Sequence, residues 1–587
     1  MSDREWRTEI RRVGSKVIGL IDRITVYLGA LGRTLLRRQK PDWIYDRVWR
    51  YRYTATVVLV AVGIFSVLTY VFLARHHAYM TTGSDLGAYV HMFSSTVSGD
   101  GWLRHGKYRV SHPDGSYWGA HFSLTLLGFI PVFALFPDAT TLLVVKSLVL
   151  ASSIVVLWLV ADRTLERRPF AFAFVLSYAF NPFLWTAWMF DFQEQILIPI
   201  FVFLSYYCYV KRRYGWFLVA VGLLLLTNEF LVPIVAGYLF GLGVISYREG
   251  RLAEERVVLL SGLGLTAAVK LLAEFVIGRF SVDAGVPVRS VAVPIREHTD
   301  EWRLSLTELV VLQLTNPELL VASFTHDLSV KATFLLLFLL PVLFLVIFDE
   351  SAVLAIIPFL VFGWFFAGRP VYYEFGAHYP FYLLPFLYIG ALGAVRSERA
   401  SIVFSMNWRT LLAGMLVMNL LVGLALDPSL TIPETDERVE RVDAAIDTIP
   451  ENATLVTQNN IYPHVATRPN ATYVAQAGLF QEYNRKYGPV EPEYILLDLS
   501  RGWSSEVIDG FGDRLDEEYG LYRYEGTVFV YMRGYEASPE RITNETGGVE
   551  TTVSVFGNDA QNATEPPPAR HGAGDAVDVR DGAVSRR

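Results

Sequence analysis

The feature that most constrains this chain is a series of long apolar runs, because a bilayer accepts only segments whose backbone groups are satisfied internally. A spanning helix needs about 20 mostly apolar residues. Nine runs reach or approach that length, namely 54–74, 139–161, 169–187, 194–210, 257–277, 331–348, 351–368, 379–395 and 409–427. The sequence therefore predicts a polytopic α-helical protein of the cell membrane and excludes a soluble enzyme. Its charged fraction of 19% is also low for a soluble protein.

Basic connectors between the runs predict the topology. Arginines and lysines gather at 163–168, 211–213, 248–251 and 396–399, and the positive-inside rule places such connectors in the cytoplasm. The run 215–246 lies between two of them, so we expect a hairpin of two short helices that turns at Asn228–Glu229. The run 121–137 is interpreted as a helix in the outer interface. The result is eleven crossings, or twelve if 121–137 also spans.

The charge distribution predicts the orientation and the domains. Residues 1–53 carry 13 Lys and Arg against 6 Asp and Glu, whereas residues 428–587 carry 14 against 27. We therefore expect a basic cytoplasmic segment at 1–53, a membrane domain at 54–427 with outer loops 75–138 and 278–330, and an extracytoplasmic C-terminus. Four N-glycosylation sequons begin in that C-terminal part, at Asn452, Asn470, Asn544 and Asn562.

The C-terminal part divides again by composition. Strand-like runs alternate with acidic helical stretches over 428–535, which predicts a small α/β domain. Residues 536–587 are rich in Pro, Gly and Asp, and we expect them to be a disordered tail. The single cysteine, Cys208, excludes an intrachain disulfide and a cysteine-based metal site. The net charge of −7 without a basic aromatic patch argues against a nucleic-acid partner.

Polar residues near the outer ends of the runs are candidates for the chemistry, because polar groups at membrane depth are costly. Asp85 lies in the segment GSDLGAYVH about ten residues after the first run, with His91 further along, and can act as a base or simply cap a helix. His121 ends the segment HPDGSYWGAH, whose aromatic residues can line a sugar site or form an interfacial belt.

Two further groups of acids fall on the same predicted side. Asp191 and Glu194 are three residues apart between two runs, where they can bind sugar hydroxyls or form a polar turn. Asn228 and Glu229 occupy the turn of the expected hairpin. Before the run at 379–395, Arg369 can bind a phosphate or anchor the interface, and His378 lies in the same loop. The sequence shows no metal-ligand spacing, no phosphate loop and no cofactor motif.

These segments resemble one uncharacterised family, the predicted membrane proteins called domain of unknown function 2079. The resemblance rests on SDLGAYVH, HFSLTLLGFIPVFALFP, NPFLW followed by FDFQE, and LLTNE, and it covers roughly residues 54–530. The family tends to have His where this chain has Gln193, and Lys where it has Asn228.

The layout is also similar to that of membrane glycosyltransferases with the GT-C fold. That similarity implies that Asp85 takes the position of the catalytic acid. The donor would be a sugar linked to a polyprenyl or dolichyl phosphate, and the acceptor a glycan or glycoprotein. Asp191, Glu194 and Glu229 would hold sugar or acceptor hydroxyls, and Arg369 the lipid phosphate. The WWDYG signature of oligosaccharyltransferases is absent, which disfavours a pyrophosphate donor and its metal, although a divalent ion remains open.

Two other classes of function stay open at the level of sequence. A transporter or flippase for a polar or lipid-linked substrate would use Asn228–Glu229, Lys270 and Glu274 as a relay, but such transporters often show two related halves and none is visible here. A non-catalytic membrane scaffold would use the outer α/β domain to bind a partner.

Overall fold

A computed structural model of the chain describes residues 42–104, 115–281, 286–287, 291–299, 303–304, 306–366, 372–373, 378–397, 407–426, 432–433 and 436–536. Most of the basic segment 1–53, the tail after 536, Arg369 and the sequons at Asn544 and Asn562 lie outside them.

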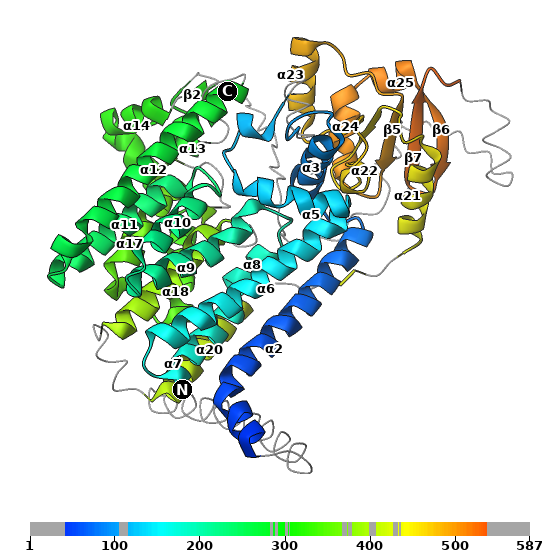
Figure 1. Cartoon of the computed structure of the whole chain (residues 1–587). Coiled ribbons are helices and arrows are strands. Elements are labelled where there is room, and N and C mark those ends of the chain that lie inside the picture. Colours follow the sequence, from blue (N-terminus) through cyan, green and yellow to red (C-terminus); the bar gives the residue numbers. More distant parts are fainter. Residues whose placement is uncertain are drawn as a thin grey trace, which may run out of the picture. The chain divides into compact units, whose positions relative to one another are not determined.

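Helices dominate the part of the chain before residue 427 (Figure 1). In chain order they are α2 Asp42–His77, α3 Ala88–Ser98, α5 Ile130–Leu135, α6 Ala139–Thr164, α7 Arg168–Ala179, α8 Pro182–Met189, α9 Ile198–Val210, α10 Tyr214–Leu225, α11 Leu231–Arg248, α12 Leu252–Phe280, α13 Val293–Arg296, α14 Leu306–Thr315, α15 Pro317–Thr325, α16 Leu328–Leu339, α17 Glu350–Val361, α18 Pro380–Arg396 and α20 Trp408–Leu426. A short antiparallel pair, β1 Val286–Pro287 and β2 Arg303–Leu304, precedes α14.

Six of the described helical segments are long and apolar enough to cross a membrane: 51–77, 139–164, 168–189, 231–248, 252–280 and 409–426. A seventh arises if the pair 317–325 and 328–342, bent by 58°, forms one span. Shorter apolar helices cover 125–135, 194–210, 214–225, 350–366 and 380–396. The multi-pass helical membrane fold is therefore confirmed, whereas the count of eleven crossings stays a prediction.

The run 215–246 is divided as expected. Helix α10 ends at Leu225 and α11 begins at Leu231, so that Asn228 and Glu229 lie in the turn. The run 121–137 forms only a 3-10 turn, Thr125–Gly128, and the six-residue α5. These helices are too short to span a bilayer.

One expected span is wrong as a single helix. The run 331–348 breaks after α16 into two 3-10 turns, Leu340–Val342 and Leu345–Phe348. Between them Leu343 and Phe344 have left-handed backbones, with φ of 53° and 58°. Pro341 explains the break, because proline has no N–H to continue the helix and clashes with the preceding turn.

The segment 437–533 forms a five-stranded mixed sheet with helices, called here the sheet domain. Its strands are β3 Leu455–Thr457, β4 Ala471–Tyr473, β5 Tyr494–Asp498, β6 Tyr519–Glu525 and β7 Val528–Arg533, in the order β4-β3-β5-β7-β6. The strands β4, β3 and β5 are parallel, whereas β7 and β6 are antiparallel to their neighbours. Its helices are α21 Glu437–Thr448, α22 Tyr462–Val465, α23 Ala477–Tyr487, α24 Trp503–Phe511 and α25 Arg514–Glu518.

The sheet domain shares a hydrophobic core with the helices. One continuous cluster of buried residues includes Leu68 of α2, Leu86, Tyr89 of α3, Tyr462 of α22 and Leu496 of β5. The helical part and the sheet domain therefore pack as one body in the described chain up to Tyr535.

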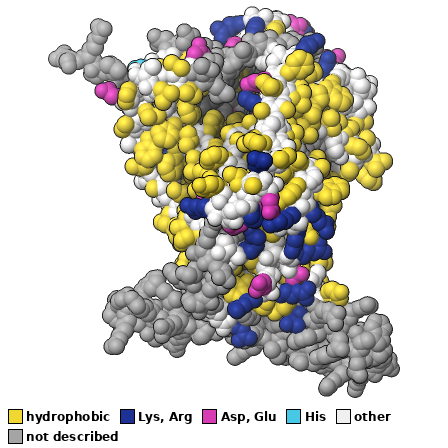
Figure 2. All heavy atoms as spheres, turned by 60° about the vertical axis from the view of Figure 1, so that its left-hand side comes forward, with side chains coloured by type: hydrophobic (Ala, Val, Ile, Leu, Met, Phe, Trp, Pro, Cys, Tyr) yellow, Lys and Arg dark blue, Asp and Glu magenta, His cyan; other side chains and the backbone are white. Residues whose placement is uncertain are grey.

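Basic connectors and candidate acids lie at opposite ends of the helices. Arg212, after α9, pairs with Glu254 at the start of α12 at 3.2 Å, and Arg248, in the last turn of α11, pairs with Glu350 at the start of α17. Glu229 lies at the other ends of α10 and α11. Figure 2 shows one face, on which hydrophobic side chains cover a broad zone and Lys and Arg side chains gather below it.

Candidate functional site

The segment that carries Asp85 follows α2 directly. Tyr79 turns the backbone with φ of 57°, and residues Gly83–Gly87 then form a short π-helical turn, η1, which continues into α3. Thr82 is the N-cap residue of this turn, but its side chain makes no capping hydrogen bond. Its hydroxyl instead faces two carboxylates.

Asp85 and Asp191 meet at Thr82. The Thr82 hydroxyl lies 2.7 Å from Asp191 Oδ2 and 3.2 Å from Asp85 Oδ2, and the Thr82 backbone N–H also donates to Asp191, at 2.7 Å. A hydroxyl has one proton, so it serves only one carboxylate at a time. The shorter contact gives that proton to Asp191. The other oxygen of Asp85, Oδ1, accepts a hydrogen bond from Gln193 Nε2 at 2.7 Å.

Cations compensate the charge of Asp191. Burial raises the pKa of Asp191, and the hydrogen bonds from Thr82 and the positive charges of Lys146 and Arg75 oppose that rise. Lys146, on α6, is 1% exposed and donates from Nζ to the carbonyls of Trp188 and Phe190, at the end of α8. It thereby fixes the turn from which Asp191 projects.

Glu194 is the most enclosed carboxylate of the site, with no exposed surface. Its Oε1 accepts from Tyr117 at 2.8 Å, Asn228 Nδ2 at 2.7 Å and Gln195 Nε2 at 3.1 Å, and its Oε2 accepts from Tyr89. Burial raises the pKa of both tyrosines well above 10, and the charge of Glu194 adds to the rise. The tyrosines therefore stay protonated and remain donors to this carboxylate.

Glu229 pairs with the segment that precedes the short helices 125–135. His121 Nδ1 lies 2.8 Å from Glu229 Oε1, and the Phe122 backbone N–H donates to Oε2 at 2.9 Å. His121 is more exposed than its partner, with 38% of its side chain accessible against 18% for Glu229. These contacts tie the segment 121–122 to the turn between α10 and α11.

Hydrogen bonds connect most of these residues into one network, called here the acidic cluster. It runs from Asp191 through Thr82 to Asp85, then through Gln193 and Tyr89 to Glu194, and from there to Asn228. Glu229 follows Asn228 in the turn. Five of the sequence-predicted residues thus come together: Asp85, Asp191, Glu194, Asn228 and Glu229.

His378 lies beside the cluster. Its ring is 4.7 Å from that of Phe190 and 4.3 Å from that of Tyr379, by centroids. Burial, together with smaller effects of the charges of His121 and Lys146, lowers the pKa of His378 to about 3. It is therefore a neutral imidazole at physiological pH.

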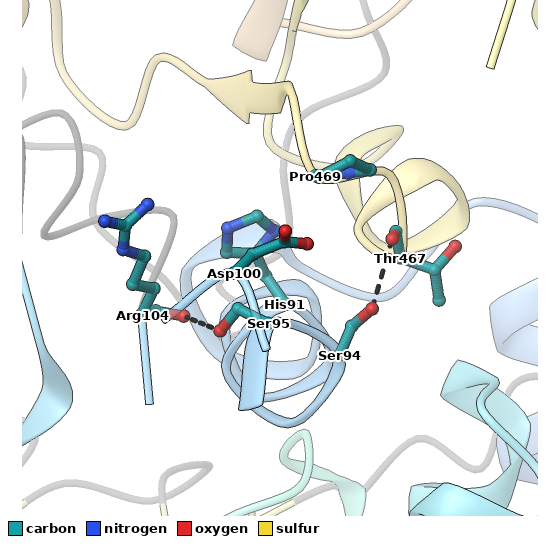
Figure 3. Close-up of a pocket in the computed structure, with 7 residues that line it drawn as sticks. All are labelled: His91, Ser94, Ser95, Asp100, Arg104, Thr467 and Pro469. Carbon is teal, nitrogen blue, oxygen red and sulfur yellow. Dashed lines mark hydrogen bonds between the residues drawn. The ribbon is translucent and has the colours of Figure 1, made fainter. Parts of the chain in front are cut away.

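His91 lies elsewhere. Its Nδ1 bonds to the carbonyl of Ala466 at 3.1 Å, and its ring lines a small pocket between α3 and the sheet domain (Figure 3). That pocket is also lined by Ser94, Ser95, Asp100, Arg104, Thr467 and Pro469. Arg369 lies outside the described residues.

The geometry invites comparison with known proteins. A model of the family described as predicted membrane protein, DUF2079, matches residues 75–520. This chain belongs to that family. The comparison with curated proteins gives no match. Among solved structures, the crystal structure of ArnT from Cupriavidus metallidurans in the apo state is similar at 13% sequence identity and a TM-score of 0.45. The match covers 83% of this chain and 98% of that one.

Gln193 and Asn228 both lie inside the cluster. The amide of Gln193 donates to Asp85, and the amide of Asn228 donates to Glu194. Each of these two carboxylates therefore receives a hydrogen bond from a neutral side chain.

Sequence reasoning missed Thr82 and Tyr89 of the cluster and the nearby Lys146. Tyr89 lies in the segment GSDLGAYVH, but nothing in that pattern marks it as a partner of Glu194. Lys146 carries a signal of its own, because a lysine inside an apolar run is expected to be buried and paired. The role of Thr82 becomes visible only when the chain folds.

The next question is whether the described residues form a metal site or a relay through Lys270 and Glu274. They contain no group of three or more His, Cys, Asp or Glu that could hold a metal ion. Lys270 and Glu274 pair with each other at 3.0 Å on α12, with about half of each side chain exposed. They do not extend the path of Asn228 and Glu229.

Proposed function

We propose that this DUF2079 protein is an integral-membrane glycosyltransferase that transfers a sugar from a lipid-phosphate donor to an acceptor on the extracytoplasmic face. The observation that carries the proposal is the acidic cluster itself. Asp85 of η1 is brought together with Asp191 and Glu194, which lie in the segment after α8, at the end of the helices opposite the basic connectors. Carboxylates in such a site can take a proton and hold sugar hydroxyls.

Asp85 is the proposed base. It is partly exposed, whereas Glu194 is fully enclosed and Asp191 receives the Thr82 hydroxyl proton. In the reaction, Asp85 takes the proton of an acceptor hydroxyl while the acceptor oxygen bonds to the anomeric carbon. The bond from that carbon to the phosphate oxygen breaks, its electron pair stays with the lipid phosphate, and the configuration at the anomeric carbon inverts.

The other members have positioning and binding roles in this proposal. Gln193 orients Asp85 through Oδ1, and in this proposal Oδ2, which faces Thr82, receives the proton. His121 and Glu229, which are partly exposed, hold sugar or acceptor hydroxyls. The neutral imidazole of His378 can donate or accept a hydrogen bond beside them. Arg369 remains the proposed cation for the lipid phosphate, and no metal or cofactor is required by the step.

The proposed topology is the one predicted from the sequence. It has eleven crossings, a cytoplasmic N-terminus and an extracytoplasmic sheet domain. The separation of Arg212 and Arg248 from Glu229 along the helices supports it.

The test compares strains that lack the gene and are complemented with the wild type, Asp85→Asn or Asp100→Asn, at equal protein levels. Asp100 is an exposed acid of the same outer loop and lies outside the cluster. We expect mass spectrometry of surface glycans and lipid-linked sugars to show a missing sugar and accumulated donor with Asp85→Asn only. Normal glycans with Asp85→Asn would remove Asp85 as the base, and normal glycans in the deletion strain would reject the transferase.

A further inference from the structure

The carboxyl ends of the parallel strands in the sheet domain meet the segment that carries Asp85. In open α/β sheets this edge is where ligands usually bind. Here β3 ends at Thr457 and β5 at Asp498, and the residues that follow β3 contact the backbone of residues 79–84. The usual ligand edge is thus occupied by the chain's own segment 79–84.

Asn459 makes the central contacts. Its carbonyl oxygen accepts from the Gly83 N–H at 2.6 Å, and its Oδ1 accepts from the Ser84 N–H at 2.9 Å. These are the first backbone donors of η1, which lack partners within the turn. Thr82, the N-cap residue, does not serve them, because its hydroxyl faces Asp191 and Asp85. Asn459 therefore caps η1 from the sheet domain.

Other residues of the sheet domain also bind the segment before Asp85. Asn460 Nδ2 donates to the carbonyl of Tyr79 at 3.4 Å, and Arg438 donates to the carbonyl of Ala78 at 2.8 Å and to Asp498 at 2.9 Å. Gln458 is fully buried and bonds to both Asn460 and the backbone of Asp498. Asn459 thus lies between Gln458 and Asn460, whose side-chain amides are both hydrogen-bonded.

Gly83 and Gly87, on either side of Asp85, show how closely this segment approaches the sheet domain. A Cβ at Gly83 would lie 2.8 Å from the carbonyl oxygen of Asn459. A Cβ at Gly87 would lie 2.6 Å from Cδ1 of Tyr462, which follows Asn459 on α22. The segment GSDLG therefore fits the sheet domain only because glycine stands at both ends.

We infer that Asn459 is a positioning residue that sets the place of Asp85, and that the sheet domain acts as a clamp on the site. The inference rests on the proposed function, in which Asp85 is the base. It assigns the domain a role in the reaction other than binding the acceptor. Removal of the Asn459 side-chain oxygen frees the Ser84 N–H and loosens the turn that carries the base.

The experiment compares the full-length wild type, Asn459→Ala and Asn459→Asp. Aspartate keeps an acceptor oxygen, and a negative charge at the start of a helical turn is favourable. Asn484→Ala is the matched control, because Asn484 Oδ1 also accepts from a backbone N–H, that of Val490 at 3.0 Å, wholly within the sheet domain.

Two readouts are needed. Hydrogen exchange of the purified protein in nanodiscs reports the order of residues 82–88 without any substrate. The initial rate at which the missing sugar returns to surface glycans after induction reports the reaction. We expect Asn459→Ala to speed exchange in 82–88 and to lower the rate about tenfold, as the loss of one hydrogen bond allows. Asn459→Asp and Asn484→Ala should stay near the wild type in both readouts.

Several results would overturn the inference. Unchanged exchange in Asn459→Ala would show that Asn459 does not order η1. Faster exchange with an unchanged rate would show that the order of η1 does not matter for the reaction. Loss of rate in Asn459→Asp equal to that in Asn459→Ala would indicate a role of the amide other than capping. If Asp85→Asn keeps the wild-type rate, the proposed function fails together with the inference, and that failure is recognised without any Asn459 variant.

Discussion

At the scale of single residues, the site is defined by how buried charge is compensated. Glu194 has no exposed surface, and a charge so placed is tolerated only when hydrogen bonds replace its water. Tyr89, Tyr117, Gln195 and Asn228 supply them. Glu194 is therefore as much a structural acceptor, to which the surrounding elements are tied, as a member of the site.

This arrangement predicts different outcomes for two substitutions of Glu194. Glutamine at 194 keeps one oxygen, which can accept from the donors that now bind Glu194 Oε1. Its NH2 group can donate to the hydroxyl of Tyr89. That hydroxyl can then donate to Oε1 of Gln193, which lies 3.0 Å away. Leucine removes both oxygens that accept these buried hydrogen bonds. We expect Glu194→Leu to lower the free energy of unfolding by about 3 kcal/mol or more and Glu194→Gln by clearly less. Thermal unfolding in detergent measures both, and equal losses would contradict the compensation argument.

At the scale of elements, the contact between η1 and α22 is a close steric fit. The ring of Tyr462 occupies the space that a side chain at residue 87 would need. We expect Gly87→Ala to destabilise the protein by about 1–3 kcal/mol, as overpacking of a core does. Gly128→Ala is the control, because a Cβ there meets nothing within 4 Å.

A double-mutant cycle makes this prediction specific. Tyr462→Ala removes the clashing ring, so Gly87→Ala should cost much less in that background. The measurement is the unfolding temperature of the two single variants and the double variant. Additive losses would show that the two residues do not meet, because only residues in contact are strongly non-additive.

The elements also show how far sequence reasoning reaches. Apolar runs predicted the helical membrane fold, and the polar pair Asn228–Glu229 predicted the turn between α10 and α11, because both depend on local composition. The break at Pro341 was missed because the surrounding run is uniformly apolar. The grouping of Asp85 with Asp191 and the contact of Asn459 with Gly83 depend on residues about 100 or 380 positions apart. No local pattern contains that information.

At the scale of the whole molecule, the sheet domain meets the end of α2 in a stack of aromatic rings. His464 of α22 lies between His76 and Tyr79, with ring centroids 4.1 Å and 3.9 Å away. The hydroxyl of Tyr79 donates to Asp443, and Arg438 lies 5.9 Å from its ring. Burial and the charge of His76, with a smaller effect of His77, hold the pKa of His464 well below 6.5. The junction is therefore built around a neutral imidazole.

A neutral buried histidine makes the junction sensitive to acid. Above pH 6.5 His464 is neutral in both the folded and the unfolded chain, so its titration does not change the free energy of unfolding. Below pH 6.5 the unfolded chain binds a proton that the folded chain excludes, and stability falls by at most about 1.4 kcal/mol per pH unit until the folded pKa is reached. We expect the unfolding temperature to fall between pH 6.5 and 5 in the wild type. His464→Phe should reduce that fall while keeping a ring in the stack, and other buried histidines such as His378, whose pKa is also lowered, account for the remainder.

His298→Phe is the control for this prediction, because His298 is an exposed histidine in the helical part of the chain. It should leave the pH dependence of the unfolding temperature as in the wild type. A wild-type slope in His464→Phe would show that the stack does not exclude the proton. A flattened slope, together with hydrogen exchange that increases in residues 78–88 of the wild type at pH 5, would place the acid-sensitive contact at the junction that also holds Asp85.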